Sequence, residues 1–134
     1  MNIEFTDNLE PTFGDHNGNP ISLKKIHEIE SINHKPITMI AVTRKQFDES
    51  DLDRYKRYII NDLGFPRFYH GFWHDGDNIE FDILYAIPTD DRTVILEHLN
   101  KHNKINDGHA QIMGLVIHMN GDFEKVVNEN TKYY

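Results

Sequence analysis

The sequence predicts an α+β fold in a single compact domain. The chain has 134 residues, hydrophobic residues make up 38% of it, and strand-like and helix-like segments alternate after residue 36. A chain of this length and composition can bury one hydrophobic core without disulfides or metals. The order of the predicted helices and strands along the chain indicates which α+β fold it is.

Residues 1–35 are predicted to be a lead-in segment that packs on a domain formed by residues 36–134. A short helix within the lead-in begins after Ser22, which suits the N-cap position, and ends near Glu30. Pro36 then favours an extended chain where the main pattern starts.

The main pattern begins with an apolar, β-branched segment over residues 37–43, which is typical of a central strand buried on both faces. A helix follows. Asp48 suits its N-cap, and apolar residues recur at helical spacing until Gly64 and Pro66 end it.

A hairpin is predicted next, because two aromatic and aliphatic runs, 68–74 and 79–87, flank the turn-forming residues 75–78. The remaining elements are a helix capped by Thr89 and ending near Asn103, a strand over 111–119, and a shorter strand over 123–127 after the turn at Asn120 and Gly121.

From residue 37 the predicted order is therefore strand, helix, strand, strand, helix, strand. This is the βαββαβ order of a ferredoxin-like split βαβ sandwich, here with an N-terminal extension and an extra C-terminal strand. Such a fold packs both helices on one sheet face and leaves the other face open. We expect a homodimer, because two-fold association is the commonest way to cover such a face.

Charge and composition narrow the class of partner. Lys and Arg total 14 against 22 Asp and Glu, and the net charge of −8 disfavours nucleic-acid binding. The chain has no Cys, which excludes disulfides and fits the cytoplasm. No segment resembles a secretion signal or approaches the roughly 20 apolar residues of a membrane helix. We therefore expect a cytoplasmic protein that does not contact membranes.

The hairpin supplies the candidate binding site. Alternation places Phe68, His70, Phe72 and Phe81 on the core face and Tyr69, Trp73 and their neighbours on the open face. We interpret the open face as an aromatic and acidic slot for a planar or cationic group, with cross-strand packing or a dimer interface as the alternative. The candidate residues are Tyr69, Gly71, Trp73, Glu80, Asp82 and His118.

Within this site, Gly71 is expected to mark a β-bulge or a close approach to the backbone. Trp73 should contribute to binding more than to folding, whereas Phe81 should contribute to the core. His118, near a strand end, is expected to face the same surface as Asp82.

The nine His residues raise the question of a metal site. His98 and His102 have the spacing of two ligands on one helix, but Leu99 replaces the Glu of the His-Glu-x-x-His pattern, and a position near the helix C-terminus favours His in any case. His70, among Phe residues, is interpreted as a core residue. We assign no metal and no cofactor.

Established nucleotide-binding and hydrolase motifs are missing from the sequence. It therefore favours a small acidic, non-catalytic binding or regulatory protein that contacts a protein partner or a second copy through its open sheet face. The alternative is a small ligand-binding enzyme in which His70, His74 or His118 acts with carboxylates in acid/base chemistry or metal ligation.

Overall fold

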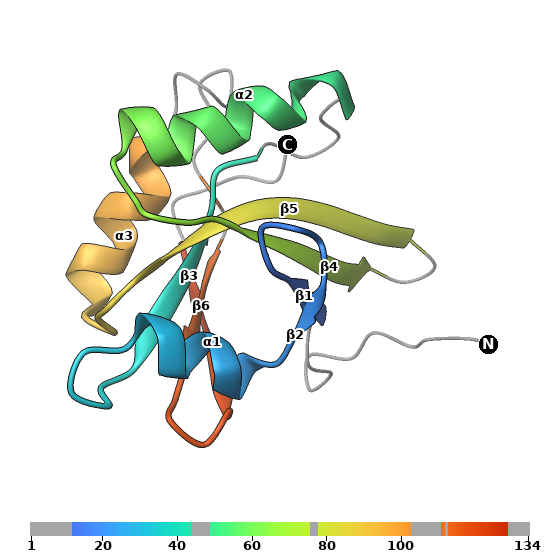
Figure 1. The fold of residues 1–134 in the computed structure, drawn as a ribbon. Coiled ribbons are helices and arrows are strands. Elements are labelled where there is room, and N and C mark those ends of the chain that lie inside the picture. Colours follow the sequence, from blue (N-terminus) through green and yellow to red (C-terminus); the bar gives the residue numbers. More distant parts are fainter. Residues whose placement is uncertain (1–11, 44–48, 76–77, 103–110, 112, 129–134) are drawn as a thin grey trace.

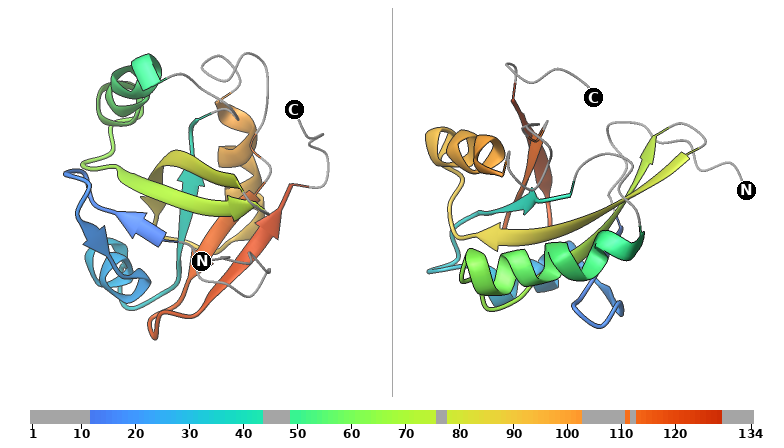
Figure 2. Two further views of the ribbon diagram at one scale, coloured as in Figure 1. Left: turned by 90° about the vertical axis from the view of Figure 1, so that its right-hand side faces the viewer. Right: turned by 90° about the horizontal axis from the view of Figure 1, so that it is seen from above.

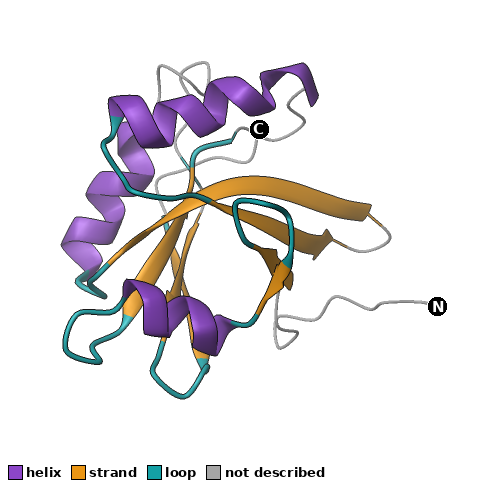
Figure 3. Ribbon diagram, viewed as in Figure 1, coloured by secondary structure: helices purple, strands orange, loops and turns teal. Residues whose placement is uncertain are grey.

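A computed structural model describes residues 12–43, 49–75, 78–102, 111 and 113–128. Within them the fold is mixed α+β (Figure 1; Figure 3). The strands are β1 (Thr12–Gly14), β2 (Pro20–Ile21), β3 (Ile37–Ala41), β4 (Tyr69–Asp75), β5 (Asn78–Ile87), β6 (Met113–Ile117) and β7 (Phe123–Val127). The α-helices are α1 (Leu23–Glu30), α2 (Leu52–Arg57) and α3 (Arg92–Lys101). A 3-10 turn, η1 (Glu49–Asp51), precedes α2, and a π-helical turn, η2 (Tyr58–Asp62), continues it.

All seven strands belong to one antiparallel sheet with the order β2-β1-β4-β5-β3-β6-β7. The strand count exceeds that of the βαββαβ pattern. The lead-in segment adds β1 and β2 beyond β4, and β7 extends the opposite edge beyond β6. Residues before position 36 are therefore part of the sheet.

Helices cover both faces of this sheet. α1 lies on one side, and α2 and α3 lie on the other (Figure 1; Figure 2). The core on the α1 side contains Phe13, Leu23, Ile26, Ile37, Met39, Ala41, Tyr69, Trp73, Leu84, Ala86, Leu115 and Ile117. The core on the other side contains Ile40, Val42, Tyr55, Ile59, Ile83, Tyr85, Ile87, Ile95, Leu99, Val116 and Val126.

The central strand and both hairpins agree with the prediction. β3 pairs with β5 and β6, and all five of its residues are buried. Apolar residues on both faces are needed because each face of β3 meets a different core. β4 with β5, and β6 with β7, form the two predicted antiparallel hairpins.

The helix caps agree only in part. Ser22 caps α1 as predicted, since its Oγ accepts a hydrogen bond from the Lys25 N–H at 3.0 Å. The cap of α3 is Asp91 rather than Thr89, because Asp91 Oδ1 accepts from the Thr93 N–H at 2.9 Å. Thr89 instead accepts from the Asp91 N–H at 3.1 Å and shapes the turn before the helix. Asp48 lies outside the described residues.

Candidate functional site

The face of the β4–β5 hairpin that was expected to be open is covered. Tyr69 and Trp73 lie on it, as alternation predicts, but only 2% of Tyr69 and 9% of Trp73 is exposed. Leu23 and Ile26 of α1, with Phe13 of β1, belong to the same core. The prediction of an open aromatic face is therefore wrong, because α1 covers the side of the sheet opposite α2 and α3.

Gly71 is explained by this packing and not by a bulge. Its pairing with Asp82 and with Phe13 continues the ladders on both sides without interruption. A Cβ atom at position 71 would lie 2.6 Å from Leu84 Cδ1 and 3.3 Å from Trp73 Nε1. A side chain at position 71 would have to displace the end of the Leu84 side chain, because the neighbouring side chains pack directly against the backbone.

Glu80 and Asp82 are the two carboxylates of the predicted site, and both lie in β5. Glu80 pairs with Trp73 in the β4–β5 ladder, but its side chain lies outside the described residues. Asp82 is half-buried, and its Oδ1 accepts a hydrogen bond from the Thr43 hydroxyl at 2.5 Å. Asp82 therefore joins the middle of β5 to the chain that follows β3.

His118 lies far from Asp82. Asp82 contacts Thr43, after the last residue of β3, whereas His118 follows Ile117, which pairs with Ile37 at the first residue of β3. The two side chains are thus at opposite ends of β3, and the expectation that they share a surface is wrong.

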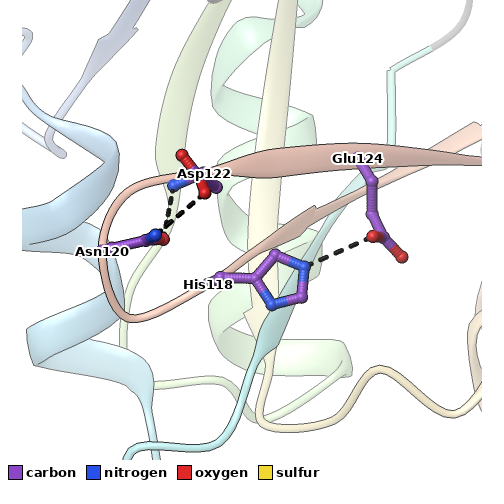
Figure 4. Close-up of polar contacts among 4 residues, drawn as sticks. All are labelled: His118, Asn120, Asp122 and Glu124. Atoms are coloured by element: carbon purple, nitrogen blue, oxygen red, sulfur yellow. Dashed lines mark hydrogen bonds and ion pairs between the residues drawn. The ribbon is translucent and has the colours of Figure 1, made fainter.

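His118 belongs instead to the turn of the β6–β7 hairpin (Figure 4). Its Nε2 lies 3.4 Å from the Glu124 carboxylate, and Asn120 and Asp122 hold the turn through their own hydrogen bonds. Glu124 is 62% exposed in its side chain, so solvent screens the pair and its contribution to stability is small. The geometry is that of a surface turn.

The exposed aromatic surface lies on the opposite face of the β4–β5 hairpin. We call Phe68, His70, Phe72 and Phe81 the aromatic patch. Neighbouring ring centroids are 5.7 Å apart for Phe68 and His70, 5.5 Å for His70 and Phe81, and 5.0 Å for Phe81 and Phe72. Phe72 is 38% exposed, and Phe68 and Phe81 are half-buried.

Basic and histidine side chains border one end of the aromatic patch. Lys56 Nζ lies 5.5 Å from the centre of the Phe68 ring, within the range of a cation–π contact. The exposed His16 contacts the same ring edge-on at 6.4 Å. At the other end of the patch, the exposed ring of Phe72 offers apolar contact area.

A backbone carbonyl orients His70 inside the patch. His70 Nδ1 lies 2.7 Å from the Asp15 carbonyl oxygen, which accepts only, so Nδ1 carries the proton. The Asp15 side chain in turn accepts hydrogen bonds from the N–H groups of Asn17 and Asn19, both at 2.9 Å. A tight turn between β1 and β2 therefore fixes the ring of a buried histidine, as the sequence predicted for a core residue.

Sequence reasoning missed a chain of hydrogen-bonded rings under α3. Tyr58 Oη lies 2.7 Å from His102 Nδ1, His102 Nε2 lies 2.8 Å from Tyr85 Oη, and Tyr85 Oη lies 2.7 Å from His98 Nδ1. We call these four residues the Tyr–His chain. The spacing of His98 and His102 is the part of the Tyr–His chain that the sequence indicates. Tyr58 and Tyr85 reach these histidines only in the folded structure.

Burial dominates the electrostatics of the Tyr–His chain. His102 is 1% exposed, and desolvation, followed by the charges of Lys101 and His98, lowers its pKa to about 4. Desolvation also lowers the pKa of His98 and raises the pKa of Tyr85 and Tyr58. All four groups are therefore neutral near pH 7.

A second buried polar cluster joins α1 to the start of β4. Glu30, at the last position of α1, accepts hydrogen bonds from the Tyr69 hydroxyl at 2.5 Å and from Arg67 Nε. Only 11% of the Glu30 side chain is exposed. Because its carboxylate bonds to groups on both sides of the α1–β4 contact, the cluster serves to hold α1 on the sheet.

Three comparisons with known proteins give no match. No family model, no curated protein and no solved structure is similar to this chain.

Neither a metal site nor a membrane-spanning helix is found among the described residues. Among the described residues, no three His, Cys, Asp or Glu side chains are arranged to bind a metal ion. None of the helices in that part of the chain has the length and apolar character that crossing a membrane requires.

Proposed function

We propose that the protein is a non-catalytic binding module that contacts another protein through the aromatic patch. The observation that supports this proposal is Phe72, a large apolar side chain 38% exposed at the end of a row of aromatic rings in contact. Exposed rings fixed in place by packing lose little conformational entropy on binding, and aromatic residues are enriched among those that dominate binding energy.

The shape of the hairpin favours contact at this position. The ends of β4 and β5 nearest their turn extend away from α2 and α3 (Figure 1; Figure 2). We expect a partner to approach from the tip of this hairpin, which lies clear of α2 and α3 among the described residues. It would contact apolar rings first and the cationic side chain of Lys56 at the far end, which suits an apolar side chain followed by an acidic one.

The partner is another protein rather than a second copy of this chain. A dimer was expected as cover for an open sheet face, but α1 covers that face within the same chain. Each copy also has a net charge of −8, and this charge opposes self-association.

A ferredoxin-like fold is proposed for the central strands and two of the helices. We infer that residues 37–117 form a ferredoxin-like unit, supported by the antiparallel strand order β4-β5-β3-β6 and by the packing of α2 and α3 on one face. We also place the protein in the cytoplasm, which the lack of Cys favours.

The proposal is tested by capture from the native cell lysate followed by titration with the purified partner. Wild type, Phe72→Ala and Ile32→Ala serve as baits. Ile32 is the matched control, because it is 58% exposed but lies after α1, away from the patch. We expect Phe72→Ala to weaken binding about 10- to 30-fold, which corresponds to about 1.4 to 2 kcal/mol, and Ile32→Ala to leave it unchanged.

Two results would contradict the proposal. One is a partner that binds wild type and Phe72→Ala equally well. The other is a wild-type dimer, detected by sedimentation at tens of micromolar, that Phe72→Ala converts to monomer. The second result would show that the patch serves self-association.

A further inference from the structure

The Tyr–His chain connects three elements through unbroken hydrogen bonds. Tyr58 comes from η2, Tyr85 from β5 and His98 from α3, and His102 is the residue that directly follows α3. The contacts of 2.7 Å, 2.8 Å and 2.7 Å are all short enough for strong hydrogen bonds. Tyr85 and His102, the two inner members, are 0% and 1% exposed, so water does not compete for them.

The number of protons couples the directions of the three bonds. Tyr85 has one hydroxyl proton but contacts two ring nitrogens, so it donates to one histidine and accepts from the other. Neutral His102 likewise carries one ring N–H and contacts two hydroxyl groups. Either every bond donates from Tyr58 towards His98, or every bond donates in the opposite direction.

His98 is the member at which an added proton selects the direction. It is half-buried, whereas the burial of His102 penalises a charge more strongly, so His98 takes a proton first. Protonated His98 carries a hydrogen on Nδ1 and can no longer accept from Tyr85. Tyr85 must then donate to His102 Nε2, and His102 must donate from Nδ1 to Tyr58.

We propose that the Tyr–His chain is a proton-responsive relay, in which protonation of His98 on α3 reverses three hydrogen bonds and frees the hydroxyl proton of Tyr58 on η2. In the reversed state Tyr58 accepts from His102, and its own O–H points out of the chain. Tyr58 follows Lys56 and Arg57 at the end of α2. The relay therefore changes a donor next to the helix that borders the aromatic patch.

Charged side chains on α3 and η2 act on the members of the Tyr–His chain. On α3, Lys101 opposes protonation of both histidines, and Glu97 favours protonation of His98. On η2, the negative charge of Asp62 acts on Tyr58 and raises its pKa. Tyr85 is the member contributed by β5, and the uncharged ring of Phe65 stacks on it at 4.3 Å. Protonation of His98 therefore responds to Glu97 and Lys101, while the other end of the chain responds to Asp62.

The proposal is tested by NMR on the full chain with ¹⁵N-labelled histidine. Long-range ¹H–¹⁵N spectra distinguish the two neutral tautomers of His102 during a titration from about pH 8 to pH 5. We expect the proton of His102 to move from Nε2 to Nδ1 over the same pH range in which His98 titrates. A His102 that keeps one tautomer while His98 titrates would overturn the relay.

Tyr58→Phe is the variant that tests the coupling, since Tyr58 is half-buried at the end of the chain. It removes the acceptor needed by His102 Nδ1–H in the reversed state, and an orphaned buried N–H is costly. We expect His102 to keep its proton on Nε2 and the pKa of His98 to fall relative to wild type. An unchanged His98 pKa, or one zinc ion bound by His98 and His102 in place of their contact with Tyr85, would overturn the proposal.

Discussion

Phe72 and Trp73 are adjacent in β4 but lie in opposite environments. Trp73 is 9% exposed against α1, whereas Phe72 is 38% exposed in the aromatic patch. Trp73→Ala should therefore destabilise the protein by about 3 to 5 kcal/mol, through lost burial and the cavity left behind. Phe72→Ala should cost about 1 kcal/mol or less, because much of its ring already contacts water.

Urea unfolding of both variants measures this difference in the free energy of unfolding. Wild type and the two variants should show equal m values, so that midpoints report stability directly. A Phe72→Ala variant that loses as much stability as Trp73→Ala would contradict the placement of the two faces. It would also remove the basis for a contact surface at Phe72.

Gly71 offers a second prediction at this scale, with Gly14 as the matched control. A methyl group at Gly71 would lie 2.6 Å from Leu84 Cδ1, whereas at Gly14 the nearest atoms are 3.5 Å away. Gly71→Ala should destabilise by about 1 to 3 kcal/mol, since the packed core has to move. Gly14→Ala should be close to neutral. Equal thermal midpoints for the two variants would show that the core yields at Gly71.

Asp91 provides a prediction at the scale of the element. It caps α3 through hydrogen bonds from the Thr93 and Val94 N–H groups, at 2.9 Å and 3.3 Å. Asp91→Ala should cost about 0.5 to 2 kcal/mol, because these donors lose their partner. Thr89→Ala should cost less, since it removes only one exposed hydrogen bond. The reverse order in thermal unfolding would restore Thr89 as the cap.

The elements were predictable where local pattern determines them. β3, the β4–β5 hairpin and α1 follow from β-branched runs, turn residues and the Ser22 cap, which act within a few positions of the chain. β1 and β2 were not predictable, because strands of three and two residues have no measurable alternation. Their pairing with β4 is a tertiary contact.

This gap explains why the candidate site was misplaced. The alternation of β4 showed which residues share a face, and that part is correct for Tyr69, Gly71 and Trp73. Which face meets a helix depends on where α1 packs, and no local pattern contains this information. The Tyr–His chain shows the same limit, since Tyr58 and Tyr85 meet His102 only after α3 docks.

The two faces of the sheet differ across the whole molecule. The α1 side is closed by apolar packing and by the Glu30 cluster, and it stabilises the fold. The α2 and α3 side contains both the Tyr–His chain and the half-exposed patch. The pH response of the Tyr–His chain therefore originates on the side of the sheet where we propose that a partner binds.

Global stability should depend on pH through His102. Its pKa is lowered from 6.5 to about 4 in the folded state, so the unfolded chain binds more protons between these values. The stability that comes from keeping His102 neutral is fully present above pH 6.5 and is lost as pH falls towards 4. The loss amounts to about 3 kcal/mol at 1.36 kcal/mol per pKa unit.

His102→Gln separates this effect from the carboxylates, which also titrate near pH 4. The variant loses hydrogen bonds to Tyr58 and Tyr85 and should be less stable than wild type at pH 7. Because glutamine does not titrate, the difference between the two proteins should shrink by about 3 kcal/mol as pH falls from 7 to 4. Urea unfolding at several pH values measures this difference directly. Stability curves that stay parallel over this range would mean that His102 is not a buried neutral imidazole, because a group with the same pKa in both states contributes no pH dependence.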